Sequence, residues 1–201
     1  MKPPLQIGTL LFPGFELLDV FGPLEMFGLL GDRVQLSMLA EQVGEVRSAQ
    51  GPRSVADATL ADVSDLDVLL IPGGRGTRRL VEKPGFLEQL RERSRRSRHT
   101  ASVCTGSALL ARAGLLDGKR ATTNKLSFDW VRTQGPAVNW VQKARWVEDG
   151  RFYTSSGVSA GMDMTLGLIG DLFDRTVSLE VARHAEYIWN EDKSDDPFAG
   201  G

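Results

Sequence analysis

Three short strand-like runs constrain the fold of this chain more than any other feature of its sequence. They are residues 5–12 (LQIGTLLF), 67–71 (DVLLI) and 100–104 (TASVC), and a glycine follows each run within two residues. Strands that are buried on both faces of a parallel sheet are apolar or small throughout instead of alternating. Helical patterns separate the runs, so the sequence predicts an α/β fold with a mostly parallel central sheet.

The other segments give expectations for single elements. Asp149-Gly150 is a hairpin signal between strands at residues 140–147 and 152–155. The remaining expectations are a helix over 16–30 interrupted at Gly22-Pro23, a strand over 34–40, a helix over 80–98 whose five arginines form a solvated face, a short helix over 127–132, helices over 159–173 and 176–190, and an acidic tail over 191–201 that frays unless it is docked.

Composition limits the class of protein. With 201 residues, 41% hydrophobic and 25% charged, the chain suits a single domain. We expect this domain to cover residues 1–201, with its core over about 5–173 and a C-terminal helix and tail over 176–201. A formal net charge of −2 gives no general attraction to nucleic acid, and the apolar runs are too short to span a membrane.

The few cysteines and histidines limit which cellular compartment and which cofactors we expect for this protein. The chain has one cysteine, which cannot form an internal disulfide, and Met1-Lys2-Pro3-Pro4 does not resemble a signal peptide. These features predict a cytoplasmic protein. The two histidines, His99 and His184, lack the spacing of metal ligands relative to the cysteine, so we expect neither a metal nor a cofactor.

The single cysteine, Cys104, lies where a strand passes into a helix that Gly114 ends. Small residues flank it, as in a nucleophile elbow, where they allow a sharp turn that projects the side chain. The free N–H groups at a helix start favour a thiolate over a thiol. An activated nucleophile is the functional interpretation, and an inert buried cysteine is the alternative.

Ligands of open α/β sheets collect at the carboxyl ends of the strands. If the three runs are neighbours, Asp19, Gly74 and Cys104 converge there, and the N–H groups of Gly74 and Thr105 can stabilise a developing anion. A carboxyl group enclosed by apolar residues has a raised pKa, and in its protonated form Asp19 could donate a hydrogen bond to the thiolate. An ordinary acid in the first turn of a helix is the alternative interpretation of Asp19.

A serine site competes with the cysteine site. Residues 157–161 match G-x-S-x-G, and Asp171 or Asp174 and then His184 follow Ser159 in the order that a serine hydrolase uses. Only two helices separate Ser159 from His184, which leaves no strand ends to carry the acid and the base. A helix N-cap is therefore the favoured role of Ser159.

Several longer motifs agree in order and spacing with a known family. The resemblance rests on LLFPGFELLDVFGPLEMF, LDVLLIPGGRGTRRL, SVCTGSALLARAGLLDGKRATTN and SSGVSAGMDMTLGLIGDLF. These stretches, between residues 5 and 173, resemble the ThiJ/PfpI superfamily and are most similar to its isocyanide hydratase-like branch. The resemblance implies a flavodoxin-like three-layer sandwich, a nucleophile-elbow cysteine and a homodimer.

The same resemblance implies roles for individual residues. Cys104 matches the catalytic cysteine, Asp19 its acidic partner, Gly74 and Thr105 the oxyanion donors, and Gly73 and Asn124 lie at positions beside the substrate. Protease-like and amidase-like members carry a histidine where this chain has Thr105, and many other relatives carry one in place of Asn124.

The departures from those relatives indicate which chemistry the resemblance implies. The combination of Asp19, Cys104 and Thr105 is that of the hydratase-like branch. It implies that the cysteine attacks the terminal carbon of an isocyanide, that Asp19 supplies a proton, and that water hydrolyses the thioimidate to an N-substituted formamide.

Two further functions stay open beside this hydratase/lyase activity on a small molecule. Cys104 could sense oxidants, or the pocket could bind a small molecule without turnover. A glyoxalase or amidase type of activity is less favoured, because both histidines of those relatives are absent. Domains of this type are also fused to helix-turn-helix regulators, but this sequence has no such segment, and we expect no nucleic-acid partner.

Overall fold

A seven-stranded sheet forms the centre of the computed structural model, which describes residues 3–200. The strand order is β10-β11-β7-β6-β1-β2-β5, and every neighbouring pair is parallel except β10 with β11. The predicted α/β fold with a mostly parallel sheet is therefore confirmed. Met1, Lys2 and Gly201 of the expected domain lie outside the described residues. The strands are β1 (Leu5–Leu10), β2 (Val34–Ala40), β5 (Ala58–Thr59), β6 (Val68–Ile71), β7 (His99–Ser102), β10 (Trp146–Asp149) and β11 (Phe152–Ser155).

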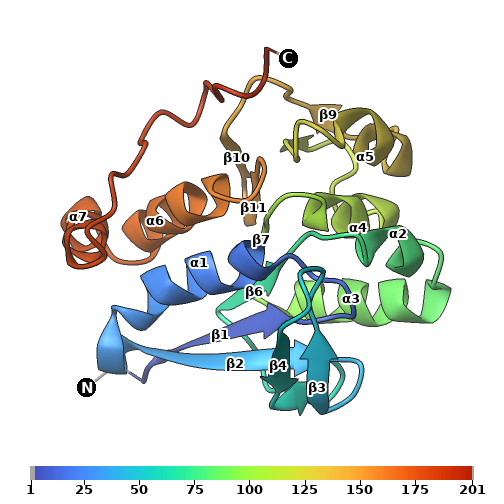
Figure 1. Ribbon diagram of the computed structural model, residues 1–201, viewed down its shortest axis with the longest axis horizontal. Coiled ribbons are helices and arrows are strands. Elements are labelled where there is room, and N and C mark those ends of the chain that lie inside the picture. The colour runs from blue at the N-terminus through green and yellow to red at the C-terminus, as the bar shows by residue number, and fades with distance from the viewer. Residues whose placement is uncertain (1–2, 201) are drawn as a thin grey trace.

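Helices cover both faces of this sheet and complete three layers (Figure 1). Helices α1, α6 and α7 lie on one side, and α2 to α5 lie on the other. A hydrophobic cluster fills the space on each side of the sheet. No helix within residues 3–200 is long and apolar enough to cross a membrane. The helices are α1 (Leu17–Gly28), α2 (Thr77–Leu80), α3 (Pro84–Arg96), α4 (Gly106–Arg112), α5 (Phe128–Gln134), α6 (Ala160–Leu172) and α7 (Arg175–His184), with a 3-10 turn, η1, at Gly31–Arg33.

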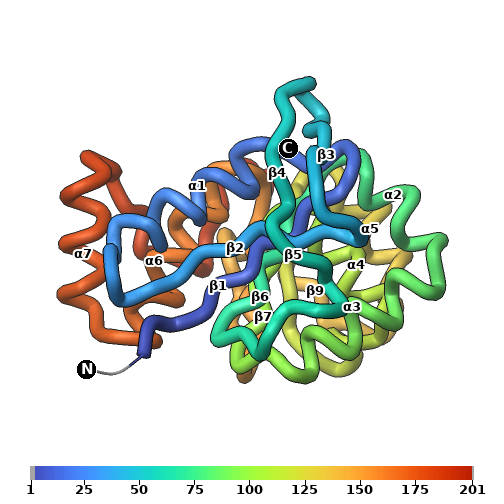
Figure 2. The backbone as a smooth tube through the Cα atoms, turned by 90° about the horizontal axis from the view of Figure 1, so that it is seen from below, coloured from blue at the N-terminus to red at the C-terminus, as the bar shows by residue number. Residues whose placement is uncertain are grey.

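Two small sheets accompany the central one. Strand β3 (Gly44–Arg47) pairs with β4 (Arg53–Ala56) in a hairpin that projects from the body of the molecule (Figure 2). Strand β8 (Arg120–Ala121) pairs with β9 (Asn139–Trp140). The hairpin predicted at Asp149-Gly150 is confirmed as β10–β11. The strand expected over residues 140–147 is wrong, since the chain between β9 and β10 bonds instead to β8 and to the C-terminal tail.

The carboxyl ends of β1, β6 and β7 lie side by side, as the sequence predicts. Strand β6 pairs with β1 on one side and with β7 on the other. The loops that leave these strands bond to one another: Glu16 donates its N–H to the Gly73 carbonyl (2.9 Å), and Val103 donates to the Ile71 carbonyl (3.0 Å). This shared edge brings the expected site residues into one region.

Helix α1 continues through Gly22-Pro23, so the predicted interruption is wrong. Proline removes one helical hydrogen bond, but both residues are buried between α1 and its neighbours. A Cβ atom on Gly22 would lie 2.8 Å from the Met162 side chain of α6. Close packing of α1 against α6 therefore outweighs the helix-breaking tendency of this pair.

The helix expected over residues 80–98 is shorter than predicted: α2 ends at Leu80, Pro84 begins α3 at a position that proline favours, and α3 ends at Arg96. The expected solvated arginine face is also wrong at one position. Arg93 is only 3% exposed, and its guanidinium donates to the carbonyls of Leu60, Ala61 and Ser64. It closes the loop between β5 and β6 instead of facing solvent.

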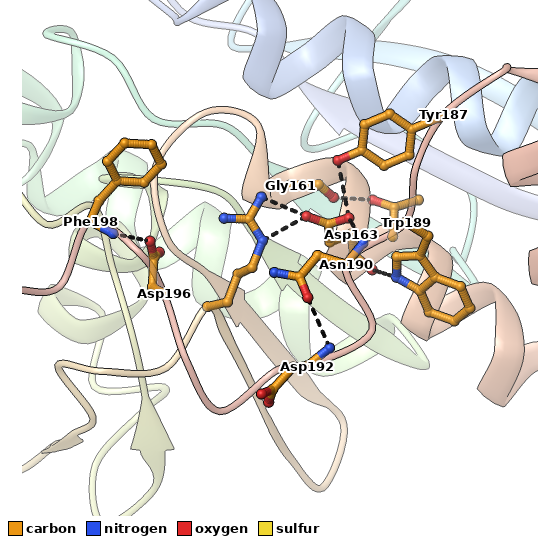
Figure 3. A network of polar contacts seen from close by, with 10 residues as sticks. Gly161, Asp163, Tyr187, Trp189, Asn190, Asp192, Asp196 and Phe198 are labelled. Carbon is orange, nitrogen blue, oxygen red and sulfur yellow. Dashed lines mark hydrogen bonds and ion pairs between the residues drawn. The ribbon is translucent and has the colours of Figure 1, made fainter.

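The last helix ends at His184 instead of reaching residue 190, and the acidic tail that follows is docked. Asp163 of α6 is the anchor (Figure 3): its Oδ1 accepts the Tyr187 hydroxyl (3.0 Å) and the Asn190 N–H (2.9 Å), and its Oδ2 pairs with buried Arg145 at 2.6 Å. Trp189 donates its indole N–H to the Asp163 carbonyl at 3.1 Å. The tail is therefore part of the folded structure.

We expect Arg145→Ala to lower the free energy of unfolding by roughly 3 kcal/mol, because it leaves the buried Asp163 carboxylate without its cation. Urea denaturation measures the loss. Arg53→Ala is the matched control, since Arg53 pairs with Glu45 while both side chains are more than half exposed, and removal of an exposed pair costs under about 1 kcal/mol. Equal losses in the two variants would contradict this account of the tail.

Candidate active site

Cys104 lies in the sharp turn between β7 and α4. Its backbone φ is 56°, in the left-handed region that side chains other than glycine rarely adopt. Its N–H donates to the Ser156 carbonyl (3.1 Å), and its own carbonyl accepts the Thr123 hydroxyl (2.9 Å). A Cβ atom on Gly106 would lie 2.4 Å from the Ile71 carbonyl oxygen, so the helix can start this close to β6 only with glycine there. The predicted strand-to-helix turn is confirmed.

Asp19, in the first turn of α1, is fully buried beside Cys104. Its Oδ2 accepts the Gly73 N–H at 2.8 Å, and the Cys104 thiol lies beside the carboxyl group and lowers its pKa. Its Oδ1 has no N–H or O–H partner among residues 3–200. The pKa of Asp19 is raised to about 8: burial is the largest cause, the hydrogen bond from Gly73 opposes it, the charge of Glu16 adds to it, and Cys104 lowers it slightly. The carboxyl group therefore holds a proton at neutral pH, as the sequence predicts.

The pKa of the Cys104 thiol is also raised, which is opposite to the expectation from the helix start. Burial is the largest cause, and the charge of Asp19 adds to it. The backbone N–H groups of Thr105 and Val158 face the sulfur and lower the pKa, but by less. The resting pair is therefore a thiol beside a carboxylic acid.

The glycine turn after β6 packs directly against the cysteine turn. A Cβ atom on Gly73 would lie 2.6 Å from the Thr105 nitrogen and 2.8 Å from the Cys104 Cβ. Gly74 has φ +118°, and its N–H donates to the Thr105 hydroxyl at 3.0 Å. Both glycine N–H groups thus bond within the protein, and their role as oxyanion donors stays a prediction. The Thr105 N–H is the predicted donor that faces the sulfur.

Asn124 lies beside the cysteine turn, at the edge of a cavity of about 690 Å³. Its Oδ1 accepts the Ser127 N–H at 3.0 Å, and its amide nitrogen packs against Gly157, where a Cβ atom would approach it to 2.6 Å. Its predicted place in the substrate pocket stays a prediction. The cavity is lined by residues 124–126, 156–159 and the tail residues Pro197, Phe198 and Gly200.

Val158 and the tail belong to the surroundings of Cys104, although the sequence did not predict either of them there. Val158 has φ 37° and directs its N–H to the Cys104 sulfur. One signal could have found it, because Val158 follows β11 and β11 is parallel to β7, so the two strand ends meet. The tail gave no local signal, since its place depends on contacts with Asp163 that are distant in sequence.

The structure does not bring the residues of the serine site together. Ser159 precedes α6 as the N-cap, although its hydroxyl makes no capping hydrogen bond. Asp171 lies near the other end of α6 and accepts the Tyr153 hydroxyl (2.9 Å), and His184 ends α7. His99, the other histidine of the chain, begins β7, at the edge of the sheet opposite Cys104. Within residues 3–200, no cluster of His, Cys, Asp and Glu could hold a metal ion.

We expect Asp19→Asn to stabilise the fold at pH 8 by roughly 3–5 kcal/mol and to change it little at pH 4. The folded pKa of Asp19, about 8, lies above the usual 3.8, so the folded state binds more protons between these values and wild-type stability falls as pH rises through them. Asparagine keeps the oxygen that accepts the Gly73 N–H and carries no charge.

Urea denaturation of both proteins across pH 4–8 makes this measurement, with Asp32→Asn on the exposed turn η1 as the control. A stability difference between wild type and Asp19→Asn that does not change with pH would show that the Asp19 pKa is not raised.

Several known proteins are similar to this chain in sequence or in structure. The model of the DJ-1/PfpI family matches residues 6–170. The isonitrile hydratase of Pseudomonas putida is 38% identical over 183 residues, which are 91% of this chain and 78% of that protein. The transcriptional regulator GbdR of Pseudomonas aeruginosa is 32% identical over 89% of this chain, which spans only 50% of the regulator. A crystal structure of a ThiJ/PfpI family protein from Pseudomonas syringae superposes with a TM-score of 0.85 at 34% identity, covering 98% of this chain and 79% of that one. The chain belongs to the DJ-1/PfpI family.

Proposed function

We propose that this protein hydrates an isocyanide to an N-substituted formamide, with Cys104 as the nucleophile and Asp19 as the proton donor. The observation that carries the proposal is the buried pair of thiol and carboxyl group without an imidazole in contact. The 38% identity to a protein named isonitrile hydratase supports the same substrate class.

The reaction needs one nucleophile and one proton. The Cys104 sulfur forms a bond to the terminal carbon of the isocyanide, and one proton from the Cys104–Asp19 pair passes to that carbon, which gives a thioimidate. Water adds to the same carbon, the carbon–sulfur bond breaks, and the thiol and the pair's protons are restored as the formamide leaves. The sum is isocyanide plus water to formamide, and no separate acid is needed for an amine leaving group.

The backbone N–H groups near the sulfur are suited to the second step, the addition of water to the thioimidate. The Thr105 N–H faces the reacting atoms and stabilises the oxygen of the water adduct as it becomes negative. If the Thr105 hydroxyl rotates away, the Gly74 N–H becomes a second donor. Gly73 holds Asp19 in place, and Asn124 forms the wall of the adjoining cavity.

The alternatives receive less support. A peroxide-sensing role would use the same cysteine, and the 38% identity to a protein named isonitrile hydratase is what favours turnover over sensing. An amidase needs an acid and a base for the amine leaving group, and both histidines of the chain lie away from the sulfur.

We also propose that the chain forms a homodimer. Leu18 and Phe21 of α1 and Leu36 of β2 are each more than a third exposed, and Val55 of β4 is 56% exposed beside them. Phe21, Leu36 and Val55 line an apolar groove of about 450 Å³. Contact with a second copy through this groove would remove its apolar surface from water.

Turnover of isocyanides by wild type is expected to fall at least on the order of 10³-fold in Cys104→Ala, which lacks the nucleophile, and on the order of 10²-fold in Asp19→Asn, which cannot give up the proton. Ser159→Ala tests the serine site and should lose far less turnover than Cys104→Ala. Formation of the formamide, followed by infrared loss of the isocyanide, gives the rates. Activity that survives in Cys104→Ala and disappears in Ser159→Ala would overturn the proposal in favour of the serine site.

For the dimer, light scattering during size-exclusion chromatography is expected to give twice the chain mass of 22.0 kDa. Phe21→Lys should shift the protein towards the monomer, because it places a charge in the apolar groove. Ile188→Lys, at a site that is 93% exposed, should leave the mass unchanged. A wild-type monomer at micromolar concentration would rule the dimer out.

A further inference from the structure

Cys104 does not line the cavity of about 690 Å³ itself, but two residues of the lining lie against the cysteine turn. Ser156 accepts the Cys104 N–H, Val158 directs its N–H to the Cys104 sulfur, and both residues line the cavity. A volume of this size accommodates a small organic ligand. A substituent that extends from Cys104 past Ser156 and Val158 would enter this space.

The cavity offers apolar surface and no available charge. Leu126 is 99% exposed and Phe198 is 70% exposed, so both present large apolar side chains at its rim. Lys125 is the charged residue of the lining, but its ammonium donates to the Ala144 carbonyl (2.6 Å) and the Thr122 hydroxyl (2.9 Å). An anionic substituent would find no cation directed at it, whereas a neutral apolar one would be removed from water.

The tail holds Phe198 in place at this cavity. The Lys193 carbonyl accepts the Arg145 N–H (3.0 Å), and the Asp196 N–H donates to the Lys143 carbonyl (2.7 Å). Asp196 is 3% exposed, and its Oδ1 accepts the Phe198 N–H at 2.9 Å (Figure 3). These bonds follow directly after the Asp163 anchor, so a segment outside the sheet supplies a fixed wall of the cavity.

We infer that Phe198 is a specificity-determining residue of the reaction, and that with Leu126 it selects isocyanides with bulky apolar substituents over short ones. The inference rests on the proposed function, because it assumes that the isocyanide carbon reacts at Cys104. It goes beyond that function in assigning the substituent pocket to the tail. Phe198 acts on binding, so its removal affects KM more than kcat.

Steady-state kinetics with phenyl isocyanide and methyl isocyanide tests the inference. In Phe198→Ala, kcat/KM for phenyl isocyanide is expected to fall roughly tenfold, mostly through KM, while kcat/KM for methyl isocyanide stays within about twofold. Phe198→Leu should restore part of the loss because it returns apolar bulk. Ile188→Ala, which removes an exposed apolar side chain that does not line the cavity, is the matched control and should behave as wild type.

Equal losses for both substrates, or no loss for phenyl isocyanide, would overturn the inference. Because Phe198 is largely exposed, its substitution leaves the buried core intact, and thermal unfolding of each variant checks this.

A second measurement separates the inference from the proposed function. Iodoacetamide and N-phenyl iodoacetamide alkylate Cys104, the single cysteine of the chain, and mass spectrometry follows each rate without any turnover. The ratio of aryl to plain rates should be several-fold higher in wild type than in Phe198→Ala. If isocyanides are not hydrated but the ratio of alkylation rates still differs between wild type and Phe198→Ala, the proposed function is wrong and the assignment of the substituent pocket is supported. If isocyanides are hydrated and the ratio does not change, the pocket assignment fails alone.

Discussion

The contact between Asp19 and Cys104 is the interaction on which the rest of the site depends. Each group is buried, and each would be costly to ionise alone in this environment. Burial raises the pKa of both groups, so the resting pair holds its protons. The Gly73 N–H, bonded to Asp19, and the N–H groups of Thr105 and Val158, which face the sulfur, assist the charged forms. These N–H groups lower the two pKa values by less than burial raises them.

Close approach of three loops makes this contact possible. The order β7-β6-β1 places their carboxyl ends at one edge, but neighbouring strand ends alone would not bring the two side chains together. Gly73 lets its turn pass so near Cys104 that even a methyl group would collide with the Thr105 nitrogen. Gly106 has the same role towards Ile71. The glycines therefore determine how near the carboxyl group lies to the sulfur.

Sequence reasoning succeeded where a local pattern determines the outcome. The apolar runs gave the parallel sheet, and the rule that strand ends share an edge brought Asp19, Gly74 and Cys104 together. Predictions were wrong where contacts between residues distant in sequence determine the local structure. Pro23 stays helical because α1 packs against α6, and Arg93 is buried because three loop carbonyls need donors. The direction of the Cys104 pKa shift was wrong because burial, which the sequence does not display, outweighs the helix start.

The absence of an imidazole beside the sulfur limits the chemistry that this pair can perform. A histidine can accept a proton at one step and deliver it to a different atom at the next, which cleavage of an amide requires. Asp19 accepts the Gly73 N–H with one oxygen and lies beside Cys104, so its proton is held next to the sulfur. When the carbon that accepts the proton is the same carbon that the sulfur has just attacked, the proton does not have to reach a distant atom. The position of the carboxyl group therefore favours addition across a terminal carbon over displacement of an amine, while the docked tail lines the cavity where the rest of the molecule would lie.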